Sequence, residues 1–483
     1  MGPLLERTAR VLATFCLLTL AVTAVVFLAF SFVHRPYNAV EAELTFEATR
    51  AAKGFALYVD PVRGAWEYGE PPSRFSVLYT PFWPYLVGYL AKVRPVTDTV
   101  RIVGRAVSIL AWLVAYIAPV LVAPRGKRTA PAVASVLGAS LFFLIRNAPS
   151  GTPDTLSAAL ASVALARAAK RDRVDTVSAV LFTAAPFMKP SCLGIFAGAF
   201  LVCVVQRKLG YKRALAAGAA MFIGLAGICH VLSGGLWIRD LVLSTGQEIS
   251  FSRWVSEFGS RSFVLGLPHV IIAVLAWRQK VRWTVLGPLL TSIAWSTFSM
   301  AKLGSGSHYW YEPTLASIVA ISAMANAEPL RPALAAWVRV GVLAMSITVA
   351  AITVPGELEQ MHAYGHYEGT IARLKERCIS GANDVAVSVD PVIEFSVSGR
   401  MIVPEWQTSF LVRHGLFPIE SWRNDVRHPN VRCVVLPDDI EHPSVNPFDL
   451  GRSNVYATEL RDVVRENFAF DGIVDGLFVH RRR

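Results

Sequence analysis

Long apolar stretches recur along this chain, and they constrain its fold more than any other feature of the sequence. An α-helix that crosses a bilayer needs about 20 consecutive, mostly apolar residues. Charged residues make up 17% of the chain, whereas a soluble domain usually carries about 25%. The mean hydropathy is +0.44. The sequence therefore predicts an all-α polytopic membrane core.

The first apolar run extends from Val11 to Val33. It is longer than the core of a cleaved signal peptide, and the following string "FSFVHRP" is a poor cleavage site. Arg7 and Arg10 precede it, and positive charge favours the cytoplasmic side. We therefore expect a retained span with the N-terminus in the cytoplasm.

Basic loops decide the rest of the topology. The segment 76–93 is long enough to cross but holds Pro81 and Pro84. If it does not cross, four basic clusters lie inside, as the positive-inside rule favours; if it crosses, all four lie outside. The clusters are Arg125, Lys127 and Arg128; Arg167, Lys170, Arg171 and Arg173; Arg207, Lys208, Lys212 and Arg213; and Arg278, Lys280 and Arg282.

The favoured topology has about eleven spans, with 76–93 lying along the outer interface. Residues 34–100 then form an extracytoplasmic loop with juxtamembrane helices. The ten spans after the first are predicted over 101–123, 129–147, 155–169, 174–188, 190–206, 213–233, 262–277, 283–301, 310–326 and 333–353.

The composition changes after Val354, which divides the chain into a membrane core over 1–356 and a polar domain over 357–483. Three strings, "DVAVSV", "VRCVVL" and "GIVDGLFVH", are typical of strands. Two others, "YEGTIARLKERC" and "ATELRDVVRENF", are typical of amphipathic helices. An odd number of spans puts this small α/β domain outside the cell.

Six cysteines divide between the two regions. Cys16, Cys192, Cys203 and Cys229 fall in predicted spans, where cysteine usually packs as a small apolar residue. Cys378 and Cys433 belong to the outer domain and could pair in an oxidising compartment. The sequence alone does not show whether they are close enough to do so.

Polar strings gather at the outer ends of the predicted spans. After the acids Glu41 and Glu43, the strings are "YTPFWP" (79–84), "GRAVS" (104–108), "GTPDTL" (151–156), "FMKPS" (187–191) and "KLGSGSHYWYEP" (302–313). Ionisable groups at membrane depth are costly and mark functional sites by default. Their convergence on one side predicts a site at the outer membrane face.

Motif searches exclude several chemistries. The chain has no nucleotide-binding glycine loop, no zinc-ligand spacing and no G-x-S-x-G elbow. The net charge of +12 resides largely in loop clusters, so nucleic-acid binding is not expected. What remains is carboxylates that could accept a proton and cations that could stabilise a departing phosphate. A lipid-linked phosphate sugar is a substrate available outside the cell.

In this order and placing, the motifs resemble those of the GT-C superfamily of integral-membrane glycosyltransferases, near the protein mannosyltransferase and aminoarabinose transferase branch. The matching strings are the acidic pair followed by "ATRAAKGFALYVDP", the "YTPFWP" helix, Gly104-Arg105, Pro153-Asp154, Lys189-Pro190-Ser191 and the late "KLGSGSHYWYE". Three positions depart from the pattern. Ala42 replaces a frequent Gly, Thr152 a common Arg, and His308 the usual Asn.

The resemblance implies an inverting hexosyl- or pentosyltransferase that uses a polyprenyl-phosphate sugar. Its acceptor would be a glycan, lipid or protein hydroxyl, and it would lie in the plasma or inner membrane with its site outside. The implied catalytic residues are Glu43, preferred over Glu41 as base, with Asp154 in support. Arg105, Lys189 and Lys302 would contact the donor phosphate, and Tyr79, His308, Tyr309 and Glu312 would line the substrate pocket. No metal ligands are assigned, although some superfamily members use a divalent metal.

Structural explanations compete with these roles. The acidic pair could solvate a helix start, Asp154 could cap a helix, Arg105 could snorkel, and His308 with Tyr309 could anchor the interface. A transporter of lipids or oligosaccharides is the alternative from another class. It would usually show an internal repeat and charges near the midplane, and neither is evident.

Overall fold

The structure is a computed structural model. It describes residues 39–59, 69–71, 80–144, 150–245, 249–257, 263–301, 307–325, 368–388, 390–402, 418–437, 439–442 and 460–483, with isolated residues and pairs before and between these ranges. The chain divides into two compact units. Unit 1 comprises Met1–Phe32, Arg105–Ile228 and Glu248–Glu357, and unit 2 comprises Val33–Gly104, Cys229–Gln247 and Leu358–Arg483.

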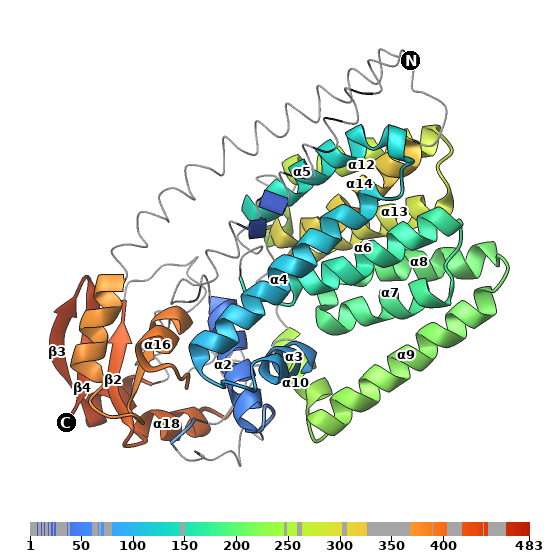
Figure 1. The fold of residues 1–483 in the computed structure, drawn as a ribbon. Helices are drawn as coiled ribbons and strands as arrows, with labels where there is room; N and C mark the ends of the chain where they lie inside the picture. Colours follow the sequence, from blue (N-terminus) through green and yellow to red (C-terminus); the bar gives the residue numbers. More distant parts are fainter. Residues whose placement is uncertain are drawn as a thin grey trace. The chain divides into compact units, whose positions relative to one another are not determined.

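Unit 1 is a bundle of helices that run side by side (Figure 1). Its helices are α5 (Thr129–Leu144), α6 (Asp154–Arg171), α7 (Thr176–Met188), α8 (Leu193–Gln206), α12 (Phe263–Arg278), α13 (Trp283–Ser299) and α14 (Tyr311–Met324). Helix α14 packs against α5, α6, α8, α12 and α13. It is therefore the centre of the bundle, and its side chains are nearly all buried.

Small residues let these helices approach closely. A methyl group on Gly198 of α8 would meet the backbone of α13 at 2.7 Å from the Pro288 Cα. The α6 face that packs inward is rich in alanine, with Ala158, Ala161 and Ala168 buried. Small residues at helix contacts are characteristic of membrane bundles, where packing rather than solvent exclusion drives association.

Each predicted span from 101–123 to 310–326 contains one helix. Two of these are long, α4 (Thr97–Val120) and α9 (Tyr211–Leu232). Within the described ranges only α4 and α9 are long and apolar enough to cross a membrane by themselves. The expected number of eleven spans is therefore not confirmed, because α7 and its neighbours are shorter than about 20 residues. The predicted spans 11–33 and 333–353 lie largely outside the described residues.

The segment 76–93 contains one short helix, α3 (Phe82–Leu90). Nine residues give a helix about 14 Å long, well short of the ~30 Å hydrocarbon layer. Pro84 falls in its first turn, where the backbone lacks an intrahelical acceptor and proline is tolerated. Helices α10 (Trp237–Thr245) and α11 (Phe251–Glu257) are additional short elements that the sequence analysis did not predict.

The C-terminal domain of unit 2 is built on a four-stranded sheet of order β1-β2-β4-β3. Its strands are β1 (Val385–Ser388), β2 (Val431–Leu436), β3 (Phe468–Val474) and β4 (Leu477–Arg482). β1 and β2 are parallel, and the other pairs are antiparallel. Helices cover both faces, which explains why β1 and β2 read as continuous apolar runs.

Alternate residues of the central strands face two separate cores. Val434 and its neighbours pack with α18 (Ile419–Arg427) and α20 (Arg461–Asn467). Cys433 and Val435 pack with the helix over 368–378 and with α16 (Pro391–Ser398). The outer domain is thus an α/β layer structure, as its sequence predicted, and α16 and α18 are elements that the sequence did not indicate.

The string "GIVDGLFVH" is β structure, as predicted, but it is divided between two strands. It contains the end of β3, a turn and the start of β4, because Asp475 and Gly476 both have positive φ, 49° and 82°. A two-residue Asp-Gly turn of this kind is typical of hairpins. Helix α20 is also shorter than the predicted helix over 457–468, since β3 begins at Phe468.

The two outer cysteines, Cys378 and Cys433, form a disulfide, with their Cα atoms 5.5 Å apart. Cys378 ends the helix over 368–378, and Cys433 lies in the middle of β2. The bond therefore ties one covering helix to the centre of the sheet. Cys192, Cys203 and Cys229 are free and buried.

Candidate active site

The acidic pair lies on α2 (Ala39–Lys53) in unit 2. Glu41 and Glu43 are 0% and 1% exposed, and Glu47, one turn after Glu43, is 0% exposed. If these acids only solvated the start of a helix, their side chains would be exposed. Their burial therefore argues against that structural explanation. Three carboxylates within two turns are instead enclosed by protein.

Packing on two sides fixes α2. Ala42 and Phe46 join a small apolar cluster with Phe395 of α16 and Met401. On another side, α3 approaches so closely that a methyl group on Gly88 would lie 2.7 Å from the Ala48 carbonyl oxygen. The carboxylate-bearing helix is therefore held by both α3 and the C-terminal domain.

A tyrosine and another acid gather beside Glu47. Burial raises the pKa of Tyr58 above its usual value, and Cys229, Asp240 and Glu47 add to the effect electrostatically. Asp240 on α10 is 3% exposed. The Tyr58 hydroxyl thus stays protonated at physiological pH and is available to donate a hydrogen bond.

Basic side chains hold the chain that follows α2. The Arg50 guanidinium, 2% exposed, donates to the Pro71 carbonyl at 2.5 Å and to the Ala56 carbonyl at 3.1 Å. Lys53 pairs with Glu70 at 2.6 Å, and Arg400 of the C-terminal domain approaches the same carboxylate at 3.4 Å. These contacts position the loop that carries Tyr58.

In unit 1 the Lys189 ammonium pairs with the Asp154 carboxylate. Lys189 is 5% and Asp154 1% exposed. Lys189 is the extended residue that ends α7, and Pro190 opens the 3-10 turn before α8. The break between these two helices therefore brings the ammonium back to the start of α6.

Asp154 is not the N-cap residue of α6. Pro153 occupies the N-cap position of α6, and Asp154 is the first helical residue, with no side-chain capping bond at this end. A carboxylate in the first turn still interacts favourably with the helix dipole. The Asp154 carboxylate forms an ion pair with Lys189.

Arg105 lies on α4 and is 0% exposed, so it does not snorkel into water. One turn further along α4, the Ser108 hydroxyl donates to the Thr152 carbonyl at 2.9 Å. Thr152 is two residues before Asp154. The α4 turn that carries Arg105 therefore lies beside the loop that carries Asp154.

Glu312 is buried near the N-terminus of α8. Its Oε1 accepts a hydrogen bond of 2.5 Å from the Ile195 N–H. A methyl group on Gly194 would lie 2.6 Å from the Ser292 Cα of α13 and 3.0 Å from the other Glu312 oxygen, so only glycine fits there without a shift. Next to it, the Tyr311 hydroxyl is 3.3 Å from Cys192 Sγ. Glu312 thus joins α14 to the first turn of α8.

The structure brings Arg105, Asp154, Lys189 and Glu312 into one region of unit 1, and it places Glu41 and Glu43 together in unit 2. Tyr309 is half-buried, and its carbonyl accepts from the Ser296 hydroxyl at 2.8 Å. Tyr79, Lys302 and the His308 side chain lie outside the described residues.

Sequence reasoning missed Glu47 and Asp240. Glu47 could have been found, because it lies four residues after Glu43 and such spacing puts both on one helix face. Asp240 carried no local signal. It reaches Tyr58 only through a contact between segments about 180 residues apart in sequence, a separation that helical periodicity does not encode.

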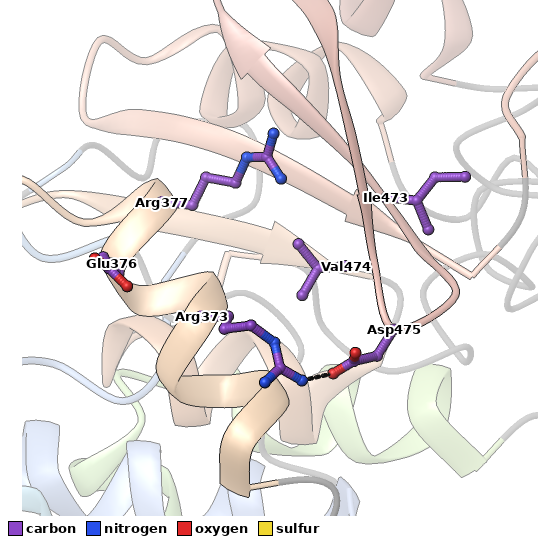
Figure 2. A pocket seen from close by; sticks show the side chains of 6 residues that line it. All are labelled: Arg373, Glu376, Arg377, Ile473, Val474 and Asp475. Carbon is purple, nitrogen blue, oxygen red and sulfur yellow. Dashed lines mark hydrogen bonds and ion pairs between the residues drawn. The ribbon is translucent and has the colours of Figure 1, made fainter.

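Among the described residues, no group of three or more His, Cys, Asp or Glu side chains is arranged to hold a metal ion. A cavity of about 510 Å³ lies elsewhere, on the C-terminal domain. Figure 2 shows Arg373 and Arg377 on one wall and the β3–β4 hairpin on the other. Both arginines are paired, with Asp475 and Asp471, and no predicted site residue lines this cavity.

Comparisons with known proteins support the fold. No family model and no curated protein matches the chain. The crystal structure of ArnT from Cupriavidus metallidurans bound to undecaprenyl phosphate matches with a TM-score of 0.54 and 12% identity, over 96% of this chain and 97% of that one. The apo oligosaccharyltransferase of Archaeoglobus fulgidus has a TM-score of 0.49 and 11% identity, over 97% and 74%.

Both of these proteins are GT-C glycosyltransferases, and ArnT is an aminoarabinose transferase. The likeness to ArnT extends over nearly the full length of both chains. It confirms the resemblance to the GT-C superfamily at the level of the fold: a mostly helical core with a small C-terminal sheet.

Proposed function

We propose that this chain is an inverting glycosyltransferase that moves a sugar from a polyprenyl phosphate to an acceptor hydroxyl at the outer face of the membrane. The burial of Glu41 and Glu43 carries the proposal. Enclosing a carboxylate costs free energy unless it is paired or hydrogen-bonded. Such groups, when they lie in a site, are candidates for acid–base chemistry.

The reaction needs one base and one stabilised leaving group. The acceptor oxygen attacks the anomeric carbon while Glu43 takes the hydroxyl proton. A new C–O bond forms on the face opposite the phosphate, and the old C–O bond breaks with its electron pair going to the polyprenyl phosphate. Direct displacement of this kind inverts the anomeric configuration.

Glu43 is preferred to Glu41 because of its neighbours on α2. Glu43 and Glu47 share a helix face, and Glu47 lies near Tyr58 and Asp240. Glu47 and Asp240 therefore join the proposed site as positioning residues.

Cations of unit 1 are proposed to receive the phosphate. Arg105 is the first candidate, because a buried guanidinium can bind a phosphate with two hydrogen bonds. Lys189 is already paired with Asp154, so it would contact the phosphate only while sharing that carboxylate. Lys302 remains a candidate from its motif. The undecaprenyl phosphate bound to ArnT suggests that a lipid of this class is the donor carrier.

Unit 2 is proposed to lie outside the cell. The Cys378–Cys433 disulfide supports this placement, because disulfides persist mainly in oxidising compartments. The α16 contact with α2 suggests that the outer domain helps to position the carboxylates and to shape acceptor access.

A transfer assay tests the function. Purified protein in lipid vesicles is incubated with a panel of polyprenyl-phosphate sugars and acceptor extracts, and free polyprenyl phosphate is quantified. We expect release with one sugar class, together with a product of inverted configuration. Movement of intact sugar lipid across the vesicle membrane, with no release from any donor, would instead support the transporter. The Glu466→Gln variant, changed at an exposed acid of the outer domain, is the matched control.

A further inference from the structure

The cavity of the C-terminal domain lies between the helix over 368–378 and the β3–β4 hairpin (Figure 2). Its volume of about 510 Å³ falls in the range of ligand pockets, about 300–1,000 Å³. Such pockets are usually lined by apolar side chains with a few polar groups. Here two arginines and two acids accompany two aliphatic residues: Arg373, Arg377, Glu376, Asp475, Ile473 and Val474. A ligand of this cavity must therefore carry many polar groups.

An irregularity of β3 places one of the arginines. The pairing of β3 with β4 shifts register between Phe470 and Gly472, so Asp471 is the bulged residue. Its carboxylate accepts a hydrogen bond of 2.6 Å from Arg377 Nε, and its carbonyl accepts another from Nη2. A methyl group on Gly472, where φ is 125°, would lie 3.1 Å from the same Nη2. The bulge and the glycine thus hold the Arg377 guanidinium against the strand, and bulges are common beside functional sites.

The hairpin turn places the other arginine. Asp475 accepts hydrogen bonds from the Arg373 guanidinium and from the Thr370 hydroxyl. Its φ of 49° lies in the left-handed region that aspartate tolerates in turns. The helix that carries Arg373 and Arg377 is tied to β2 by the disulfide of Cys378. Both walls are therefore fixed before a ligand binds, and such preorganisation lowers the entropy cost of binding.

Both arginines keep hydrogen-bond donors for a ligand. A guanidinium has five N–H donors in one plane. Within the described residues, Arg373 forms hydrogen bonds only through Nη2, and Arg377 only through Nε and Nη2. Their side chains are 51% and 34% exposed. Nε and Nη1 of Arg373, with Nη1 of Arg377, can therefore donate to a ligand in the cavity.

Charge balance disfavours a simple ion as the ligand. The charges of the two arginines and the two lining acids sum to zero, and Asp471, paired with Arg377, adds one more negative charge. An anion would meet carboxylates and a cation would meet guanidinium groups, so each would be opposed by like charge. A hydroxyl group both donates and accepts hydrogen bonds. Hydroxyls on neighbouring carbons can therefore bond to a guanidinium and a carboxylate at the same time.

We propose that this cavity binds a neutral saccharide. Ring hydroxyls would accept from Arg373 and Arg377 and donate to Asp475, and such bonds to charged groups are stronger than bonds between neutral groups. Val474 lies between the two arginines (Figure 2), so an apolar C–H face of the sugar can pack on it. The binding does not depend on glycosyl transfer. If the chain transfers sugar as proposed, the saccharide is its acceptor, and that role alone rests on the proposed function.

Ligand-observed NMR tests the binding. The full chain is reconstituted in phosphatidylcholine nanodiscs, because maltoside and glucoside detergents would compete for the cavity. Saturation transfer is titrated with neutral trisaccharides of glucose, mannose, galactose and arabinose, and with trigalacturonic acid as the charged counterpart. We expect at least one neutral trisaccharide to bind, and trigalacturonic acid to bind more weakly. Arg373→Gln and Asp475→Asn should each weaken binding by roughly tenfold or more, the loss expected for a hydrogen bond to a charged group.

Arg432→Gln is the matched control. The Arg432 side chain is 50% exposed and pairs with Asp384 at 3.1 Å, but it lies outside the set that lines the cavity, so its substitution should leave binding unchanged. Thermal unfolding midpoints establish that the variants are folded. The proposal is wrong if no neutral trisaccharide binds, if only trigalacturonic acid binds, or if Arg373→Gln and Asp475→Asn bind like wild type.

The acceptor role has its own readout. With the trisaccharide that binds used as acceptor, Arg373→Gln should raise KM several-fold and leave kcat unchanged. An unchanged KM would overturn the acceptor role and leave the binding site. Binding without transfer to any acceptor would remove the acceptor role together with the proposed function, so the two failures can be told apart.

Discussion

The ammonium of Lys189 and the carboxylate of Asp154 form an ion pair in which both side chains are buried, one from the end of α7 and the other from the start of α6. The sequence predicts separate roles for these two residues, Asp154 beside the base and Lys189 at the donor phosphate. Their pairing makes them one unit: whatever anion approaches Lys189 also meets Asp154.

Breaking this pair should destabilise unit 1. Asp154→Asn removes the carboxylate charge that Lys189 contacts and leaves a buried ammonium, which typically costs about 3–5 kcal/mol. The double variant Asp154→Asn with Lys189→Met should recover part of this loss, because it removes both charges. Thermal unfolding of the purified variants measures both effects. Equal midpoints for wild type and Asp154→Asn would show that the pair does not stabilise the bundle.

Removing the disulfide should loosen the outer domain alone. Cys378→Ala with Cys433→Ala should cost about 2–5 kcal/mol, because the bond joins residues 55 apart in sequence. Limited proteolysis of the full chain should then cut first within residues 368–483. Reduced wild type is the matched control and should behave like the double variant. Unchanged resistance in both would mean that the bond is dispensable.

The C-terminal domain should also respond to acid through Glu441. Hydrogen bonds from the Arg465 and Arg461 guanidinium groups lower the pKa of Glu441 to about 2, from an ordinary value of 4.5. A lowered folded-state pKa contributes stability above the ordinary value and loses it as the pH falls toward 2. Hydrogen exchange of α20 should therefore be slower in wild type than in Glu441→Gln near neutral pH.

The same comparison near pH 2 provides the control for Glu441. There the carboxyl of wild type is about half protonated and most of its stabilising contribution is lost, so the difference in exchange of α20 between the two proteins should be much smaller. A difference that persists unchanged across the whole range would assign the effect to packing rather than to charge.

The topology can be tested at the loop between α4 and α5. A cysteine at Gly126 should resist an impermeant maleimide in intact cells, because the Arg125, Lys127 and Arg128 cluster is expected inside. A cysteine at Phe470 should react from outside. Labelling of position 126 without permeabilisation would invert the proposed orientation.

Apolar patterns in the sequence predicted where the helices lie better than they predicted whether each helix crosses the membrane. Apolar runs located α13 and α14 to within two residues at each end, because a helix that packs in a bundle needs an unbroken apolar stretch. The same runs did not establish how many helices cross the membrane. α7 and α8 are separated only by Lys189 and a 3-10 turn, and their lengths are set by packing and by Pro190, not by bilayer thickness.

The candidate site was predictable where its residues lie in short motifs. The sequence predicts Glu41, Glu43, Asp154 and Lys189 in this way, and the structure describes all four as buried. The sequence could not show that Lys189 meets Asp154, 35 residues away, or that Asp240 meets Tyr58. Such contacts depend on the tertiary fold, which brings distant segments of the chain together. Local periodicity carries no information about these long-range contacts.

The central claim is that a carboxylate of α2 takes the acceptor proton, and the turnover of three matched glutamine variants tests it most directly. Glu43→Gln keeps the size of the side chain and should lower turnover by roughly 10²–10⁴-fold, the loss expected for a general base. Glu41→Gln and Glu47→Gln should retain more activity, with unfolding midpoints like that of Glu43→Gln. If none of the three slows transfer more than a few-fold in a folded protein, the buried acids are structural and the mechanism is wrong.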